Sequence, residues 1–108
     1  MHLHNNKVTL EKEIERRLGE ELKAMGCLFY KFVSPGNQGV PDRIIVTPCG
    51  RVAFVELKTD HGHLTSIQLR QIKRLEKHGA TVFVLYGEEH MARLLSWIRR
   101  LEGLTYDV

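Results

Sequence analysis

The sequence has few of the features that mark secreted, metal-stapled or membrane-embedded proteins. Its 108 residues include two cysteines, Cys27 and Cys49, and neither belongs to a CxxC pair. We therefore expect a reduced pair in the cytoplasm instead of a disulfide or a zinc site. No apolar run approaches the roughly 20 residues that span a bilayer, which excludes an embedded membrane protein. No glycine-rich loop opens a predicted helix, which argues against a small-molecule enzyme that cradles a phosphate.

What remains is the composition of an ordinary globular protein, with 43% apolar and 27% charged residues. A chain of this length predicts a single domain over residues 1–108, with residues 1–8 as a flexible lead. The net charge is +3, which is mildly basic. This charge permits a polyanionic partner but does not require one.

The spacing of apolar residues predicts an alternation of helices and strands. The expected elements are helix 9–25 with Thr9 as its N-cap, strand 27–33, two strands within 39–58, helix 66–78, strand 80–86 and helix 88–101. The order strand, helix, strand after residue 52 implies a right-handed parallel crossover. We therefore predict an α/β fold, in which a mixed sheet of about four strands is flanked by helices.

The faces of the last two helices are also predicted from spacing. In helix 66–78 the inward residues are expected to be Ile67, Ile72, Leu75 and Leu69, and in the last helix Met91, Leu94, Leu95 and Ile98. The strand 80–86 and Trp97 could form an interface with a second copy or belong to the core, and the core is favoured.

Charged residues stand only at the ends of the two strands within 39–58. Asp42 opens the first strand, while Glu56 and Lys58 close the second. Antiparallel pairing brings the start of one strand beside the end of the next, and alternation puts Glu56 and Lys58 on one face. Asp42 and Glu56, with the backbone carbonyl of Leu57, would suit a hard divalent cation such as Mg²⁺, which needs only one or two carboxylates. Lys58 could orient the attacking water or stabilise charge on phosphorus, so the pattern predicts hydrolysis of a phosphodiester.

Other polar residues leave two interpretations open. Glu11 lies in the first turn of its helix, where the dipole favours an acid, whereas Glu15 is either solvated or directed at the site. Lys31 is either an exposed strand lysine or a phosphate contact. Gln68 could reach the site or the substrate. A basic side of helix 66–78 is either solvated or a contact for backbone phosphates, and it carries Arg70, Lys73, Arg74 and Lys77.

Taken together, the motifs resemble a known family. GVPDRIIV, GRVAFVELK and LTSIQ look like the PD-(D/E)xK nuclease superfamily, and more closely its virus-type replication-repair nuclease (VRR-NUC) domains. KFVSPGNQGVPDR and EKEIERRL resemble the family's stretch before the catalytic aspartate and its opening helix. The resemblance covers about residues 11–86 and implies a restriction-endonuclease-like core. It also implies an Mg²⁺- or Mn²⁺-dependent nuclease with Asp42, Glu56 and Lys58 as motif residues.

Two further residues are assigned by this resemblance. Gln68 matches the family's glutamine after the ExK motif. We choose Glu15 as the acid supplied by the helix because its spacing to Gly26 is similar to that in archaeal junction resolvases, with Glu11 as the alternative.

The resemblance also suggests a substrate and a setting. Stand-alone copies of this size look phage-borne, which implies the cytoplasm of a bacterial host. They are similar in design to resolvases, which act as two-fold dimers on four-way (Holliday) junctions. We therefore expect a homodimeric, structure-specific endonuclease, with Lys31, Arg70, Lys73 and Arg74 contacting DNA. The alternatives are a flap or other branched-DNA nuclease, a restriction-type nuclease, or a non-catalytic nucleic-acid-binding module.

Overall fold

The computed structural model describes residues 6–58 and 62–103. Its elements, in chain order, are α1 (Asn6–Ala24), β1 (Leu28–Lys31), β2 (Arg43–Val46), β3 (Val52–Lys58), α2 (Ser66–Lys77), β4 (Thr81–Tyr86) and α3 (Glu88–Leu101). The strands form a four-stranded sheet in the order β1-β2-β3-β4. Neighbours β1, β2 and β3 run antiparallel, and β4 runs parallel to β3. The predicted mixed α/β fold, with its hairpin and its crossover, is confirmed.

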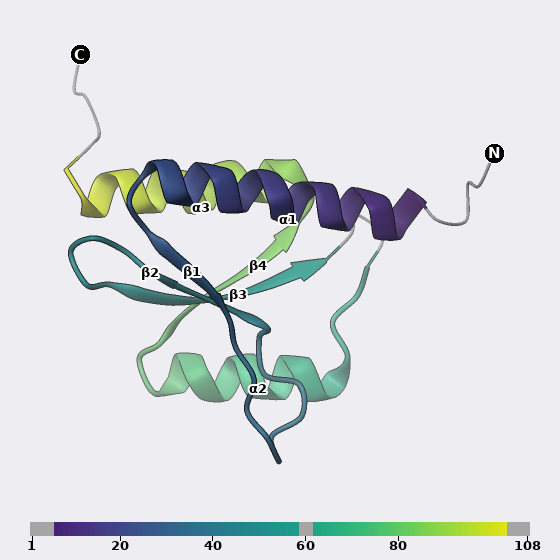
Figure 1. Cartoon of the computed structure of the whole chain (residues 1–108). Coiled ribbons are helices and arrows are strands. Elements are labelled where there is room, and N and C mark those ends of the chain that lie inside the picture. The colour runs from purple at the N-terminus through teal and green to yellow at the C-terminus, as the bar shows by residue number, and fades with distance from the viewer. Residues whose placement is uncertain (1–5, 59–61, 104–108) are drawn as a thin grey trace.

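Helices cover both faces of the sheet. Figure 1 shows α1 and α3 lying together above the sheet and α2 below it. Alternation along β3 divides its side chains between the two layers. Val55 and Leu57 are buried in the core cluster with Leu18 and Leu22 of α1. Glu56, between them, therefore points to the layer of α2.

The main core lies between the sheet and the α1–α3 layer. The four residues predicted to face inward from α3, Met91, Leu94, Leu95 and Ile98, are all buried there. Trp97 packs edge-on against Phe83 of β4, with ring centroids 5.2 Å apart, so it contributes to this core. No helix of the described part is both long and apolar enough to cross a membrane. Neither Cys27 nor Cys49 forms a disulfide.

The first helix and the first strand differ from their predicted bounds. α1 begins at Asn6, so Thr9 lies inside the helix instead of capping it, and residues 6–8 of the predicted lead belong to the helix. No glycine or proline in that stretch opposes helix extension. Residues 1–5 lie outside the described residues. β1 ends at Lys31, short of the predicted Val33, and one further backbone bond, from the Phe32 amide to the carbonyl oxygen of Asp42 at 2.8 Å, closes the loop that follows.

The inward face of α2 is narrower than predicted. Ile72 is buried, but Ile67 is 44% exposed and Leu69 is 41% exposed, so their predicted inward orientation is wrong. The helix packs mainly against β4, at one edge of the sheet. A helix in this position needs only a thin apolar stripe, and the residues on its flanks stay accessible.

Candidate active site

Strand pairing brings the predicted site residues to one edge of the β2–β3 hairpin. Arg43 pairs with Val55. Asp42, one residue earlier, therefore stands beside Glu56, one residue later, as the antiparallel pattern predicts. Asp42 is exposed and its backbone is tied to Phe32 at the base of the preceding loop. The carboxylate of Asp42 is thus available at the surface next to a buried one.

The Glu56 carboxylate is buried between polar partners. The residue is only 6% exposed. Its Oε2 lies 3.9 Å from Nζ of Lys58 and 3.5 Å from Nε2 of Gln68. A charge removed from water is tolerated only where such partners offset the loss of hydration, and its field acts more strongly there than in bulk water. Leu57 has its side chain in the opposite core, so only its backbone could contribute to this side of the sheet.

Gln68 is held in place by the start of α2. The backbone amide of Gln68 donates to the Thr65 hydroxyl at 3.1 Å, and the side-chain Oε1 of Gln68 accepts from the backbone amide of Thr65 at 2.9 Å. This reciprocal capping box fixes the side chain and leaves its Nε2 directed at Glu56. The structure therefore brings Gln68 to Glu56, and its part in a catalytic site stays a prediction.

The loop before Asp42 packs against the same end of α2. Gly39 has a φ of +86°, and a Cβ placed there would lie 2.5 Å from Cγ2 of Ile67 and 3.0 Å from the amide nitrogen of Gln68. Gln71 also donates from Nε2 to the carbonyl oxygen of Gln38 at 3.1 Å. Sequence reasoning did not single out Gly39 or Gln71, because both contacts join segments far apart in the chain.

The structure places Glu15 away from this cluster. Its Oε2 accepts two hydrogen bonds from Arg43, one of them from Nε at 2.9 Å. Arg43 neighbours Asp42 in sequence but shares the face of Val55, toward α1. The structure thus joins Glu15 to Arg43 and does not bring it to Glu56. Glu11, the alternative acid, lies one turn earlier in α1, and its side chain is outside the described part.

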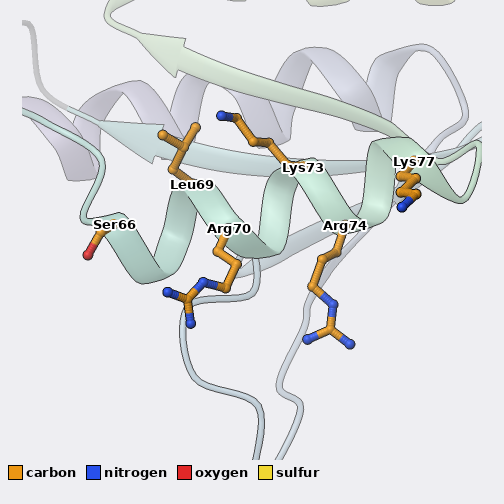
Figure 2. A pocket seen from close by; sticks show the side chains of 6 residues that line it. All are labelled: Ser66, Leu69, Arg70, Lys73, Arg74 and Lys77. Atoms are coloured by element: carbon orange, nitrogen blue, oxygen red, sulfur yellow. The ribbon is translucent and has the colours of Figure 1, made fainter.

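The predicted DNA contacts fall on opposite faces of the sheet. Lys31 pairs with Arg43 across β1 and β2, on the face of α1. Arg70, Lys73 and Arg74 are exposed on α2, on the face of Glu56. Figure 2 shows them around a shallow pocket that Ser66, Leu69 and Lys77 complete.

The fold and this strand-end arrangement define the class of protein. One helix, three antiparallel strands, a second helix and a parallel strand make the core of the PD-(D/E)xK nucleases, which the sequence motifs predicted. The chain belongs to the VRR-NUC family of these nucleases, because the profile of the VRR-NUC domain matches residues 6–89.

Individual relatives agree with this assignment. The chain is 43% identical over 79 residues to a protein of Acyrthosiphon pisum secondary endosymbiont phage 1 that is named "Putative nuclease p44". The match spans 73% of this chain and 85% of the phage protein. A solved structure described as a VRR_NUC domain superposes with a TM-score of 0.74 at 31% identity, over 80% of this chain and 94% of that one. The chain is therefore a phage-type nuclease domain.

Proposed function

We propose that this nuclease is a divalent-metal-dependent endodeoxyribonuclease that cuts branched DNA in the cytoplasm of a bacterial host. The observation that carries the proposal is the buried Glu56 carboxylate, held between Lys58 and Gln68 and next to exposed Asp42. A buried acid at the end of a strand adds little to stability, so its presence there favours a chemical role.

The side chains fit a bound Mg²⁺ or Mn²⁺ ion. Among the residues that the structure describes, no three acidic, histidine or cysteine side chains are grouped closely enough to form an all-protein cage. Mg²⁺ does not need one, since it keeps several waters and takes one or two carboxylates. Asp42 and Glu56 would hold the ion, with the Leu57 carbonyl as a third ligand. When bound, the ion would offset phosphate charge and lower the pKa of a coordinated water.

The remaining residues support this chemistry. Lys58 would stabilise negative charge on the phosphoryl oxygens and help orient the water. Gln68 would hold the Glu56 carboxylate in the rotamer that presents it to the ion. The family resemblance favours Glu15 as the helix acid, but its two hydrogen bonds to Arg43 favour Glu11 for that role, with Glu15 supporting the strand from the other face.

We further propose a four-way junction as the substrate and a homodimer as the active form. A junction is resolved by two symmetric cuts, which two sites related by a two-fold axis can deliver. Flaps and other branched DNAs are the alternative substrates for the same chemistry.

The test is cleavage of labelled DNAs by wild type, Lys58→Ala and the control Lys23→Ala, which removes an exposed lysine from the other layer. The panel holds a linear duplex, a 5′ flap, a splayed arm and a four-way junction, each with Mg²⁺, Mn²⁺ or EDTA. We expect paired nicks in the junction that disappear with EDTA. Loss of Lys58 should slow them by about 100- to 1,000-fold, the usual effect of removing one transition-state stabiliser.

Each other outcome contradicts a different part of the proposal. Cutting confined to flaps would retain the chemistry and reject the junction. Cutting in EDTA would reject metal dependence. Binding of all four DNAs without cutting would reject the enzyme and leave a nucleic-acid-binding module.

A further inference from the structure

We propose that the exposed basic face of α2 is the surface on which the sugar–phosphate backbone of the DNA docks. The basic face consists of Arg70, Lys73, Arg74 and Lys77. This inference deepens the proposed function, because it specifies the surface of the nuclease that would hold the substrate. It assigns no such role to the opposite layer of α1 and α3.

Charge is distributed unequally between the helices. α2 carries these four basic residues and one acid, Glu76. α1 carries five basic and five acidic residues, and α3 carries three basic and two acidic ones. The layer below the sheet therefore holds most of the net positive charge that helices contribute to the molecule.

The basic residues of the two layers also differ in their partners. On α1, Arg16 pairs with Glu13 and Glu20, and Arg17 pairs with Glu88 of α3. Within residues 6–58 and 62–103, none of the four side chains of the basic face forms an ion pair with a carboxylate. An anionic ligand would thus meet charges on α2 that no carboxylate of the described residues has already neutralised.

The shape of this surface suits a strand of nucleic acid. The basic face follows the spacing i, i+3, i+4 and i+7, so it forms one stripe about 10 Å long. Successive phosphates of one strand advance by about 3.4 Å along a duplex, so the stripe spans about three of them. Figure 2 shows Arg70 and Arg74 extending from the same side of the helix, beside a shallow pocket that also includes Ser66 and Leu69.

The basic face belongs to the same helix that reaches the candidate active site. Gln68 lies in the first turn of α2 and touches Glu56, whereas the basic residues lie on the opposite, solvent side of the helix. A backbone bound along the basic face would therefore lie on the layer of α2, the side of the sheet to which Glu56 points. Lys31 lies on the other face of the sheet, beside the Glu15–Arg43 ion pair, and so does not extend this surface.

The inference is tested by the salt dependence of DNA binding in EDTA, where no metal-dependent cleavage interferes. Fluorescence anisotropy of a labelled duplex of about 30 base pairs is measured between about 50 and 200 mM salt. The variant replaces Arg70, Lys73, Arg74 and Lys77 with glutamine. The matched control makes the same change at four exposed basic residues of α1 and α3, namely Lys23, Arg93, Arg99 and Arg100. Both variants lose the same charge, but from opposite layers.

Each phosphate contact contributes about 0.9 to the slope of log affinity against log salt. We expect the α2 variant to lose about 3.6 of this slope, and the control to lose less than about 1. For wild type, the four contacts alone should weaken binding about 150-fold across the fourfold rise in salt. An unchanged slope in the α2 variant, or an equal loss in the control, would overturn the inference.

A parallel Mg²⁺ cleavage assay separates this inference from the proposed function. A wild type that cuts no DNA, together with an α2 variant that loses the expected slope, would reject the nuclease mechanism and support the docking surface. A wild type that cuts DNA, while the α2 variant keeps its full slope, would reject the docking surface alone.

Discussion

Replacing Gly39 with alanine tests how closely the loop before Asp42 is held against α2. Gly39 has a φ of +86°, and a Cβ there would lie 2.5 Å from Cγ2 of Ile67 and 2.9 Å from its carbonyl carbon. The left-handed backbone costs a non-glycine residue about 1–2 kcal/mol. Forcing extra volume into a packed contact costs about 1–3 kcal/mol more. We therefore expect Gly39→Ala to lower the free energy of unfolding by about 2–5 kcal/mol.

Gly36 provides the control within the same loop. Its φ is +83°, but a Cβ there would have nothing within 4 Å. Gly36→Ala should therefore incur only the backbone cost of about 1–2 kcal/mol. Urea denaturation followed by circular dichroism would measure both variants, with equal slopes m expected. If Gly39→Ala is no less stable than Gly36→Ala, the packing of the loop on Ile67 is not the constraint that the structure implies.

Two further predictions concern contacts on either face of the sheet. Glu15→Gln and Arg43→Gln should each lower the free energy of unfolding by about 1.5–3 kcal/mol. Each substitution leaves the charge of the other residue partly buried without its ion-pair partner. A double-mutant cycle should show coupling between them, and strictly additive losses would contradict the ion pair. Thr65→Ala and Gln68→Ala should each cost about 0.5–2 kcal/mol through the lost capping box. Only Gln68→Ala removes the contact with Glu56, so only that variant should also slow cleavage, and equal cleavage rates would contradict a role for Gln68 in the site.

The parts of the site that sequence reasoning reached are those governed by strand geometry. Alternation along a strand and pairing across a hairpin are set by local chemistry, so the edge shared by Asp42, Glu56 and Lys58 could be predicted from the amino-acid sequence alone. The same holds for the inward stripe of α3, whose four residues repeat at helical spacing.

Contacts between layers were not predictable in the same way. Helical spacing shows which residues share a face, but the angle at which a helix meets the sheet depends on how its buried residues pack. In α1, Leu18 and Leu22 fit the core so that Glu15 reaches Arg43. The choice of Glu15 rested on its spacing to Gly26, and this spacing does not show how α1 is oriented on the sheet. Extension of α1 back to Asn6 was missed for another reason: Thr9 is a favoured N-cap residue, and it lies nearer the apolar stripe than the asparagines at positions 5 and 6.

The exposed positions of α2 also show that helical spacing alone does not predict how a helix packs on the sheet. A 12-residue helix that packs mainly on the edge strand β4 buries a thin stripe, so the apolar residues Ile67 and Leu69 remain accessible. Ile67 nevertheless supports the glycine of the loop, and Leu69 lies beside the basic face. Exposure that looks like imperfect packing thus occurs where the helix meets the loop and where DNA is proposed to dock. A helix wholly devoted to the core could not serve either contact.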